Sequence, residues 1–281
     1  MKPAPFDYVR ADSAAETVGL LARHGEEAKI LAGGQSLLAM LNFRLAQPAM
    51  LVDISRCGDL DYVRIDKAHL VVGAAVTQAR VERRASLAAE VPLLDLALPW
   101  VSHFQIRNRG TVCGSVAHAD PSAELPLCLV ALGGEVVLRS KSGRRVLNAE
   151  QFFQGMLMTA VQPGEIVEEV RFPLRQPGTG YAFEEMSMRH GDYAIVAVAA
   201  VASGAAVELT VGGVADRPQR RQWPNLPGAD LDAAINDFAW ELEAQSDAHA
   251  SAQYRRHLVR QLGRRTIERA KAEVEANHET V

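Results

Sequence analysis

Two adjacent glycines between a strand and a helix constrain the fold of this chain more than any other feature. Residues 29–32 have the composition of a short buried strand, Gly33 and Gly34 follow as a turn, and leucines recur at helical spacing from about Ser36. With a second strand expected at 49–54, the segment predicts a β–loop–α–β unit. Glycines let a backbone approach a ligand closely, and the amides that begin a helix favour a phosphate. The segment contains neither G-x-G-x-x-G nor a Walker lysine, so an ordinary tight turn remains the alternative to a phosphate loop.

Further strand and helix patterns follow along the chain. Ser13 begins a capping box that opens a helix, Gly25 ends that helix, and Asp120-Pro121 favours the start of another helix. The other expected elements are hairpins at 61–75 and 135–147, helices from 77, over 91–104 and over 124–132, a long loop over 106–122, strands at 167–173, 181–188, 194–202 (or a helix there) and 206–214, and helices at 230–242 and 250–275.

The segment 175–180, which is rich in proline and glycine, is the clearest linker in the chain. Roughly 150 residues per domain gives a prior of about two domains for a chain of this length. We therefore expect a first domain at 1–176, with subdomains at about 1–56 and 57–176, and a second domain at 177–281.

Composition excludes several classes of protein. Hydrophobic residues at 48% and charged residues at 23% are typical of a globular protein. A net charge of −4 and 6% aromatic residues argue against a nucleic-acid partner. The three cysteines form no C-x-x-C pair, so neither a disulfide framework nor a cysteine-bound metal site is expected in this chain. No apolar run has the length of a transmembrane helix and no signal peptide is visible, so we expect a cytoplasmic protein without an integral membrane segment.

A second segment that could carry chemistry runs from Arg109 to Glu124. It is rich in small side chains and hydroxyls, which would let a planar or phosphorylated ligand lie against the backbone. Asp120 and Glu124 could accept hydrogen bonds from ribityl or ribose hydroxyls. Loops of this length are uncommon unless they are functional, so a cofactor site and a structural loop with a capping aspartate both remain open. His118 forms no triad or metal signature with Cys113 or His190, so we predict no catalytic residue and no metal ligand.

Two later segments are Phe183–Ala194, which contains a charged Arg-His-Gly-Asp turn, and Gly212–Pro218. The four segments in this order resemble the FAD-binding medium subunit of the molybdenum hydroxylases, the family of xanthine dehydrogenase and carbon monoxide dehydrogenase. The resemblance covers nearly the whole chain. It implies an α+β fold, with a two-part FAD-binding domain of the vanillyl-alcohol-oxidase type followed by a smaller C-terminal α+β domain.

The same resemblance implies FAD as the cofactor of this chain. The loop Leu31–Leu38 matches the family's pyrophosphate-binding loop, Gly110–Ser115 matches its second flavin loop, and Glu124 matches an acidic contact. Val101 and Val167 match contacts at the sides of the cofactor. The predicted cofactor residues, including two near the isoalloxazine end (184 and 193), are Leu31, Ala32, Gly33, Gly34, Gln35, Ser36, Leu37, Leu38, Val101, Gly110, Thr111, Cys113, Gly114, Ser115, His118, Asp120, Glu124, Val167, Glu184 and Tyr193.

The chain departs from the family pattern at two of these positions. Cys113 replaces the first glycine of the usual Thr-Ile-Gly-Gly, from which we infer a requirement for a small side chain rather than for positive φ. Xanthine dehydrogenase relatives have a lysine at the position of Glu184. Its absence removes a positive charge near the flavin and disfavours NAD⁺ as the electron acceptor.

The resemblance also implies partner subunits. A large subunit with molybdopterin–molybdenum hydroxylates the substrate, and a small subunit carries two [2Fe–2S] clusters, in an assembly expected to be a dimer of heterotrimers. This chain would take electrons from the clusters and pass them to an external acceptor. The alternatives are a stand-alone FAD-dependent oxidoreductase of the same fold and a nucleotide-binding assembly or regulatory protein.

The last expected helix carries six arginines, which form either a solvated charged face or a contact with another subunit: Arg255, Arg256, Arg260, Arg264, Arg265 and Arg269.

Overall fold

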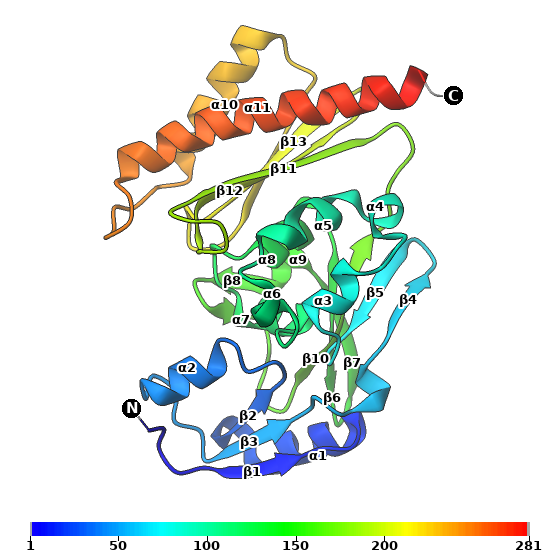
Figure 1. Ribbon diagram of the computed structural model, residues 1–281, viewed down its shortest axis with the longest axis vertical. Helices are drawn as coiled ribbons and strands as arrows, with labels where there is room; N and C mark the ends of the chain where they lie inside the picture. The colour runs from blue at the N-terminus through cyan, green and yellow to red at the C-terminus, as the bar shows by residue number, and fades with distance from the viewer. Residues whose placement is uncertain (1, 280–281) are drawn as a thin grey trace.

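Three α+β parts follow one another along the long axis of the molecule in the computed structural model, which describes residues 2–279 (Figure 1). The first part has the sheet β1-β3-β2, the second has β4-β5-β10-β6-β7, and the third has β11-β12-β13-β14. The first sheet is parallel and the other two are antiparallel. This architecture confirms the predicted α+β class.

The N-terminal part contains the predicted β–loop–α–β unit and one strand that the sequence did not suggest. Its elements are β1 (Asp7–Arg10), α1 (Ala14–His24), β2 (Ala28–Leu31), α2 (Leu37–Asn42) and β3 (Met50–Asp53). The unexpected strand is β1, whose side chains are mostly exposed and show no alternation of buried and exposed positions.

The carboxyl ends of these three parallel strands meet at one edge of their sheet. Arg10 and Leu31 both lie opposite Asp53 in the register of the sheet. The predicted capping of α1 is confirmed, since the Ser13 side chain accepts a hydrogen bond from the Glu16 amide at 3.1 Å. Ligands commonly bind at the carboxyl edge of a parallel sheet, so this edge is the first place to look for a site.

The middle part builds short helices on its antiparallel sheet. The strands are β4 (Val63–Asp66), β5 (His69–Gly73), β6 (Glu135–Ser140), β7 (Gly143–Asn148), β8 (Phe153–Gly155), β9 (Met158–Thr159) and β10 (Ile166–Pro173). The helices are α3 (Gln78–Glu82), α4 (Leu87–Glu90), α5 (Pro92–Ala97), α6 (Phe104–Arg107), α7 (Val112–His118), α8 (Glu124–Ala131) and α9 (Ala149–Phe152).

Two predictions about the segment 106–122 are wrong. The expected long loop contains α7, which Thr111 caps by accepting a hydrogen bond from the Gly114 amide at 3.0 Å. Small residues dominate this helix and gave no clear apolar periodicity. Asp120 does not cap α8: its carboxylate accepts from the Ser122 amide at 2.9 Å, and Ala123 occupies the N-cap position.

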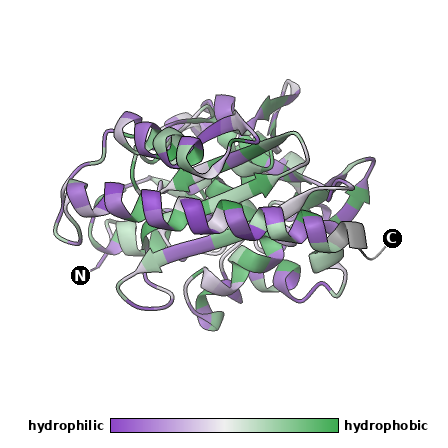
Figure 2. Ribbon diagram, turned by 90° about the horizontal axis from the view of Figure 1, so that it is seen from above, coloured by the Kyte–Doolittle hydropathy of each residue, from purple (hydrophilic) through white to green (hydrophobic). Residues whose placement is uncertain are grey.

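The C-terminal part is a sheet with helices on both faces. It consists of β11 (Gly180–Ser187), β12 (Ala194–Ala202), β13 (Ala206–Gly212), β14 (Gln219–Pro224), α10 (Gly228–Glu241) and α11 (Ala252–Glu279). One face packs against α10 and α11, and the other packs against α5 and α8 of the middle part. Figure 2 shows α11 from above, with mainly hydrophilic residues toward the viewer. The strand β14, rich in polar residues and at the edge of the sheet, was not predicted.

All eight residues of α8 are buried because the helix lies between the middle part and the C-terminal sheet. On the other face of that sheet, α11 approaches β11 so closely that a Cβ on Gly180 would lie 2.0 Å from the carbonyl oxygen of Ala270. The C-terminal sheet is therefore packed tightly on both faces.

The six arginines of α11 all contact partners within the C-terminal part. Four form ion pairs, one lies with its guanidinium 4.1 Å from the centre of the Trp240 ring, and one donates to the Asn236 side chain at 3.1 Å. In that order they are Arg255, Arg264, Arg265, Arg269, Arg256 and Arg260.

Candidate functional site

The two predicted cofactor loops touch through their backbones. A Cβ on Gly33 would lie 2.2 Å from the carbonyl oxygen of Arg109 and 2.7 Å from the Cα of Gly110, so no side chain fits there. Gly34 has a φ of 74°, a left-handed conformation that glycine adopts without strain. One glycine therefore permits the contact between the loops, and the next permits the turn.

The first loop presents backbone donors that the chain itself does not use. The amides of residues 33–36 have no acceptor among the described residues, and backbone hydrogen bonding resumes where the Leu38 amide donates to the carbonyl of Gly34. The Gln35 side chain donates to the carbonyl of Gly33 at 2.9 Å, which steadies the turn. Successive free amides of this kind suit the oxygens of a phosphate group.

The second loop places small side chains opposite the first. A Cβ on Gly114 would lie 3.9 Å from the Cβ of Ala32, and Ser115 follows on the same helix. Cys113 lies in the first turn of α7 without positive φ, and its thiol donates to the carbonyl of Val72 at 3.3 Å. Burial strongly raises the pKa of the Cys113 thiol, so this cysteine is a small packing residue and not a nucleophile.

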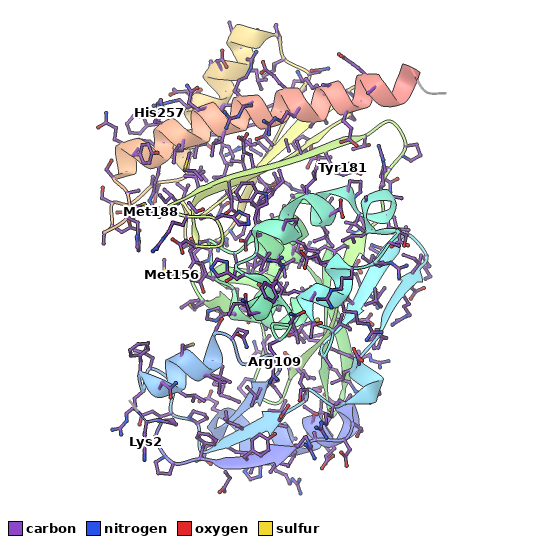
Figure 3. The ribbon with its side chains drawn as sticks, viewed as in Figure 1. Lys2, Arg109, Met156, Tyr181, Met188 and His257 are labelled. Atoms are coloured by element: carbon purple, nitrogen blue, oxygen red, sulfur yellow. The ribbon has the colours of Figure 1, made fainter. Side chains whose placement is uncertain are left out.

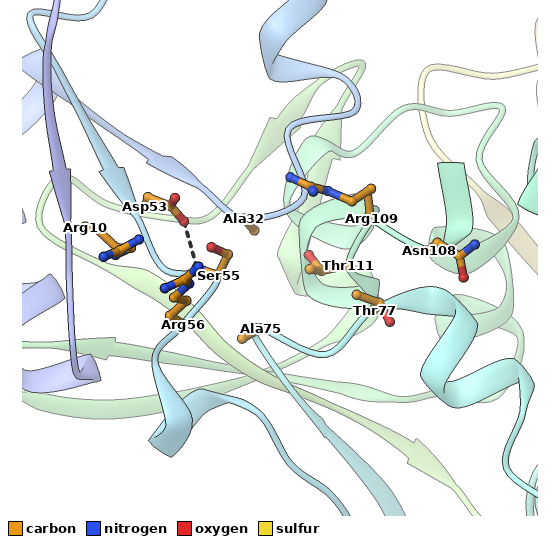
Figure 4. Close-up of a pocket in the computed structure, with 10 residues that line it drawn as sticks. All are labelled: Arg10, Ala32, Asp53, Ser55, Arg56, Ala75, Thr77, Asn108, Arg109 and Thr111. Atoms are coloured by element: carbon orange, nitrogen blue, oxygen red, sulfur yellow. Dashed lines mark hydrogen bonds between the residues drawn. The ribbon is translucent and has the colours of Figure 1, made fainter. Parts of the chain in front are cut away.

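A cleft of about 420 Å³ opens beside the contact between the loops, between the N-terminal and middle parts (Figure 4). Three of its residues are arginines that form no ion pair within the described chain: Arg10, Arg56 and Arg109. Figure 3 shows Arg109 between these two parts of the molecule. Uncompensated guanidinium groups around a polar cleft favour an anionic ligand.

Asp53 adds an acceptor to this cleft. It accepts hydrogen bonds from the Tyr8 hydroxyl at 2.5 Å and from the Ser55 amide at 2.8 Å. Partial burial acts to raise the pKa of Asp53, but these hydrogen bonds outweigh it and hold the pKa below its usual value. The sequence interpretation missed Arg10, Arg56 and Asp53 as site residues. Recognition of β1 would have found them, because the ends of parallel strands share one edge.

Acidic groups gather on the other side of α7. Glu124 at the start of α8 is 7% exposed, and burial, with the charge of Asp120, raises its pKa to about 7. Tyr193, on the turn after β11, is 65% exposed, and local desolvation followed by the charges of Asp120 and Glu124 raises its pKa. Asp120 and Glu124 are thus close enough to act electrostatically on Tyr193, and His118 lies at the end of α7, nearby in the chain.

Val101 and Val167 are both buried, and Val101 lies in a braced turn. Arg107 donates to the carbonyls of Val101 and Ser102 at 2.9 and 3.1 Å and pairs with Glu82. Ser102 has a positive φ of 44°. An unusual backbone conformation held by a buried arginine indicates a turn whose shape matters.

Glu184 lies apart from the other predicted residues. Its carboxylate pairs with Arg265 and Arg269 of α11, on the face of the sheet that lies away from α8. Successive side chains of a strand point to opposite faces, so the neighbouring Glu185 faces α8. Burial, and then the charge of Glu124, raises the pKa of Glu185 to about 8, although the sequence interpretation did not single out Glu185.

The residues of the two loops and the cleft fit the pyrophosphate of FAD, through free amides, close backbone approach and arginines. No group of three or more His, Cys, Asp or Glu side chains in the part of the chain that the structure describes is placed to hold a metal ion. Within residues 2–279, no helix is long and apolar enough to cross a membrane.

Comparison with known proteins places these features in two adjoining families. Residues 4–175 match the profile described as FAD binding domain in molybdopterin dehydrogenase, and residues 181–270 match the CO dehydrogenase flavoprotein C-terminal domain. The chain is 38% identical over 283 residues to the 6-hydroxypseudooxynicotine dehydrogenase complex subunit alpha of Paenarthrobacter nicotinovorans, covering 96% of each chain. It is 36% identical to the carbon monoxide dehydrogenase medium chain of Afipia carboxidovorans, covering 97% of this chain and 99% of that one.

Solved structures resemble the chain over its whole length. A chain of the Cu,Mo-CO dehydrogenase in its cyanide-inactivated form superposes with a TM-score of 0.92 at 34% identity, covering 97% of this chain and 100% of that one. A chain of quinoline 2-oxidoreductase from Pseudomonas putida 86 gives 0.90 at 32% identity, covering 99% of both chains.

Proposed function

Because the chain belongs to the family of FAD-binding subunits of the molybdenum hydroxylases, we propose that it carries electrons from the iron–sulfur clusters of a partner subunit to an external acceptor. It is an oxidoreductase subunit whose cofactor is FAD. Bound FAD supplies the ability to accept and release electrons, and the chain's own residues bind it, orient it and exclude water.

The backbone contact between the two glycine loops is the observation that carries this proposal. Residues 31–38 and 110–115 would hold the pyrophosphate between them, with the free amides of 33–36 as donors. Two negative charges would then lie near the unpaired guanidinium groups of Arg10, Arg56 and Arg109. A tight turn with no ligand would explain the glycines but not the unused donors and arginines.

The remaining contacts are proposed for the rest of the cofactor. Val101 and Val167 would pack at its sides, and His118, Asp120, Glu124 and Tyr193 would lie along α7 and toward the isoalloxazine end. Glu184 is held by α11, so its proposed influence passes through the strand β11. We place the FAD-binding domain at 1–176, in subdomains of about 1–56 and 57–176, and the C-terminal flavoprotein domain at 177–281.

The proposed partners are a large subunit with molybdopterin–molybdenum and a small subunit with two [2Fe–2S] clusters, assembled in the cytoplasm as a dimer of heterotrimers. Two relatives are named as parts of larger enzymes, one as a subunit of a dehydrogenase complex and one as a medium chain. A stand-alone flavoenzyme or a nucleotide-binding assembly protein would need no such partners.

Co-expression of the chain with its neighbouring coding sequences, followed by size-exclusion chromatography, tests the proposal. We expect a flavin absorbance spectrum, and iron and molybdenum in the same peak. A colourless chain that stays colourless after addition of FAD would contradict the flavin site. A yellow chain that elutes alone and oxidises a substrate by itself would instead support the stand-alone enzyme.

A further inference from the structure

The cleft between the N-terminal and middle parts has two walls of polar side chains (Figure 4). One wall is the carboxyl edge of the first sheet, where the register places Arg10 beside Asp53. Ser55 and Arg56 continue this wall, and the opposite wall belongs to the middle part and includes Arg109 and Thr111. The volume of about 420 Å³ lies in the usual range for a small-molecule pocket.

The cleft adjoins the contact between the two glycine loops. Ala32 lines the cleft and directly precedes Gly33, and Thr111 lines it and directly follows Gly110. A Cβ on Gly33 would lie 2.7 Å from the Cα of Gly110, so the loops meet at the border of the cleft. A dinucleotide whose diphosphate lies at this contact would therefore extend into the cleft with one of its two ends.

The side chains of the cleft favour the nucleoside end over the flavin end. None of the 10 residues that line it in the described part of the chain is aromatic or a large aliphatic residue. The broad, apolar isoalloxazine ring requires such side chains, because pockets bury apolar ligands mainly against hydrophobic and aromatic groups. Hydroxyl and guanidinium groups instead suit a sugar and a phosphate, and a guanidinium plane also stacks on a nucleobase.

The charges of the cleft match a diphosphate. Arg10, Arg56 and Arg109 form no ion pair within residues 2–279, and Asp53 is the one carboxylate among the described residues that line the cleft. Three guanidinium groups and one carboxylate leave an excess of two positive charges. This excess equals in size the negative charge of the diphosphate of a dinucleotide, so a ligand of this kind would neutralise the cleft.

Asp53 is held in place with part of its hydrogen-bonding capacity unused. It is the last residue of β3, and it accepts from the Tyr8 hydroxyl at 2.5 Å and from the Ser55 amide at 2.8 Å. An ionised carboxylate has about four acceptor sites, so it can accept further hydrogen bonds from a ligand. In dinucleotide-binding folds, an acidic side chain near the carboxyl edge of a parallel sheet accepts from a ribose hydroxyl in this way.

We propose that this cleft binds the adenosine half of FAD, with Asp53 accepting hydrogen bonds from the ribose hydroxyls and Arg10 and Arg56 contacting the adenine and its phosphate. The proposal rests on the FAD site proposed above and assigns residues to the part of the cofactor that carries no flavin. It makes the cleft a specificity site, because FMN lacks the adenosine half and would leave the cleft empty.

Titration calorimetry of the full-length protein freed of flavin tests the cleft without any redox activity. We expect ADP to bind once per chain and to be displaced by FAD. We expect 2′-deoxy-ADP to bind at least about 10-fold more weakly, the value of one hydrogen bond to a charged group. FMN should bind more weakly than FAD by a larger factor, because it makes none of the contacts in the cleft.

The variant Asp53→Asn tests the ribose contact directly. Its ADP affinity should fall, and ADP and 2′-deoxy-ADP should bind about equally, because the acceptor that distinguishes them is weakened. Tyr8→Phe keeps the carboxylate but removes one of its holders, so it should reduce the discrimination without abolishing it. Asp7→Asn is the matched control: Asp7 is an exposed aspartate at the other end of β1, and this variant should discriminate as wild type does.

Several results would overturn the proposal. They are ADP that stays bound when the chain is loaded with FAD, equal affinities of wild type for ADP and 2′-deoxy-ADP, and undiminished discrimination in Asp53→Asn. Protein that binds FAD with a normal flavin spectrum but does not bind ADP would also overturn it, and would leave the proposed function intact. Protein that binds neither FAD nor ADP would instead contradict the proposed function itself.

Discussion

The two faces of the C-terminal sheet differ in whether their ionisable side chains have partners. On the outer face, every arginine of α11 has a partner within the chain, and Arg265 binds Glu184. On the inner face, Glu185 is buried without a hydrogen-bond partner among the described residues, and the separate cleft between the N-terminal and middle parts leaves Arg10 and two other arginines without an ion pair there. Paired charges stabilise the fold, whereas ionisable groups without partners indicate that a ligand or a proton binds there.

The largest expected effect is on the pH dependence of stability, through Glu185. Its pKa is raised from 4.5 to about 8, so the folded state binds the proton more tightly than the unfolded state. Stability is then greatest at low pH and falls as pH rises through this range. The side chain of Glu185→Gln cannot ionise, so the free energy of unfolding of this variant should not fall as pH rises. We therefore expect the variant to be more stable than wild type at pH 8 by several kcal/mol. Urea unfolding at pH 5 and pH 8 measures the difference.

Removing the charge of Asp247, on the outer side, should change stability in the opposite direction, so this residue serves as the control. Backbone hydrogen bonds from Ala250 and His249, and then Arg255, lower its pKa to about 2. Its contribution is present above the ordinary value near 3.8 and is lost as pH falls through about 2, so Asp247→Asn should be less stable than wild type at pH 5 and at pH 8. If both variants shift stability in the same direction, the contrast between the two faces is wrong.

The next largest effect on stability is expected for Arg255, which tests whether the arginines of α11 stabilise the fold. It is 6% exposed, donates to the carbonyls of Ile195 and Gly213 at 2.7 and 2.6 Å, and pairs with Asp247 at 2.5 Å. Arg255→Ala should cost about 3 kcal/mol in urea unfolding, because two buried carbonyls lose their donor. Arg256→Ala should cost only about 0.5–1 kcal/mol, the value of an exposed cation–π contact.

This result would also separate folding from assembly. The sequence left open whether the arginine helix contacts another subunit, and the structure gives every one of these arginines an internal role. Loss of Arg255 should therefore lower the stability of the chain on its own. If the chain alone is unaffected while the complex dissociates, the arginines serve the interface.

The sequence predicted the elements whose signals are local. The glycine turn at 33–34 and the cap at Ser13 have clear patterns and appear in the structure, and the apolar run 194–202, which the sequence left open between a strand and a helix, is the strand β12. The strands β1 and β14 were missed because their side chains are largely exposed, and α7 was missed because small residues show little periodicity. Exposed edge strands are specified by their partners in the sheet, which a linear pattern does not reveal.

The candidate site likewise contains some residues with a local sequence signal and others without one. The loops around Gly33 and Gly114 could be found from sequence because glycine and small residues are conspicuous. Arg10 and Glu185 could not, because each acquires its role only when strands far apart in the chain come together. Glu184 shows another limit: the resemblance assigns it to the cofactor, and the sequence did not reveal that its side chain pairs with Arg265 of α11.

Gly33→Ala tests the contact between the two loops. The added methyl group would meet the carbonyl of Arg109 at 2.2 Å, so the loops must separate. Overpacking of this kind costs about 1–3 kcal/mol, and we expect FAD to bind about 5- to 150-fold more weakly by fluorescence titration of the apoprotein. Gly58→Ala is the matched control, because a Cβ there would meet nothing within 4 Å. Equal affinities in the two variants would show that the contact is irrelevant to the cofactor.

The smallest effect concerns the unpaired arginines of the cleft. Arg10→Gln and Arg56→Gln each remove a charge near the proposed pyrophosphate, and each should weaken FAD binding by about 0.5–1 kcal/mol at low salt. The loss should shrink as ionic strength rises, because salt screens these partly exposed charges. Arg23→Gln, on the exposed side of α1, should change neither the affinity nor its salt dependence. If the cleft variants behave like Arg23→Gln, unpaired arginines do not indicate a ligand here, and the inner and outer regions differ only in their carboxyl groups.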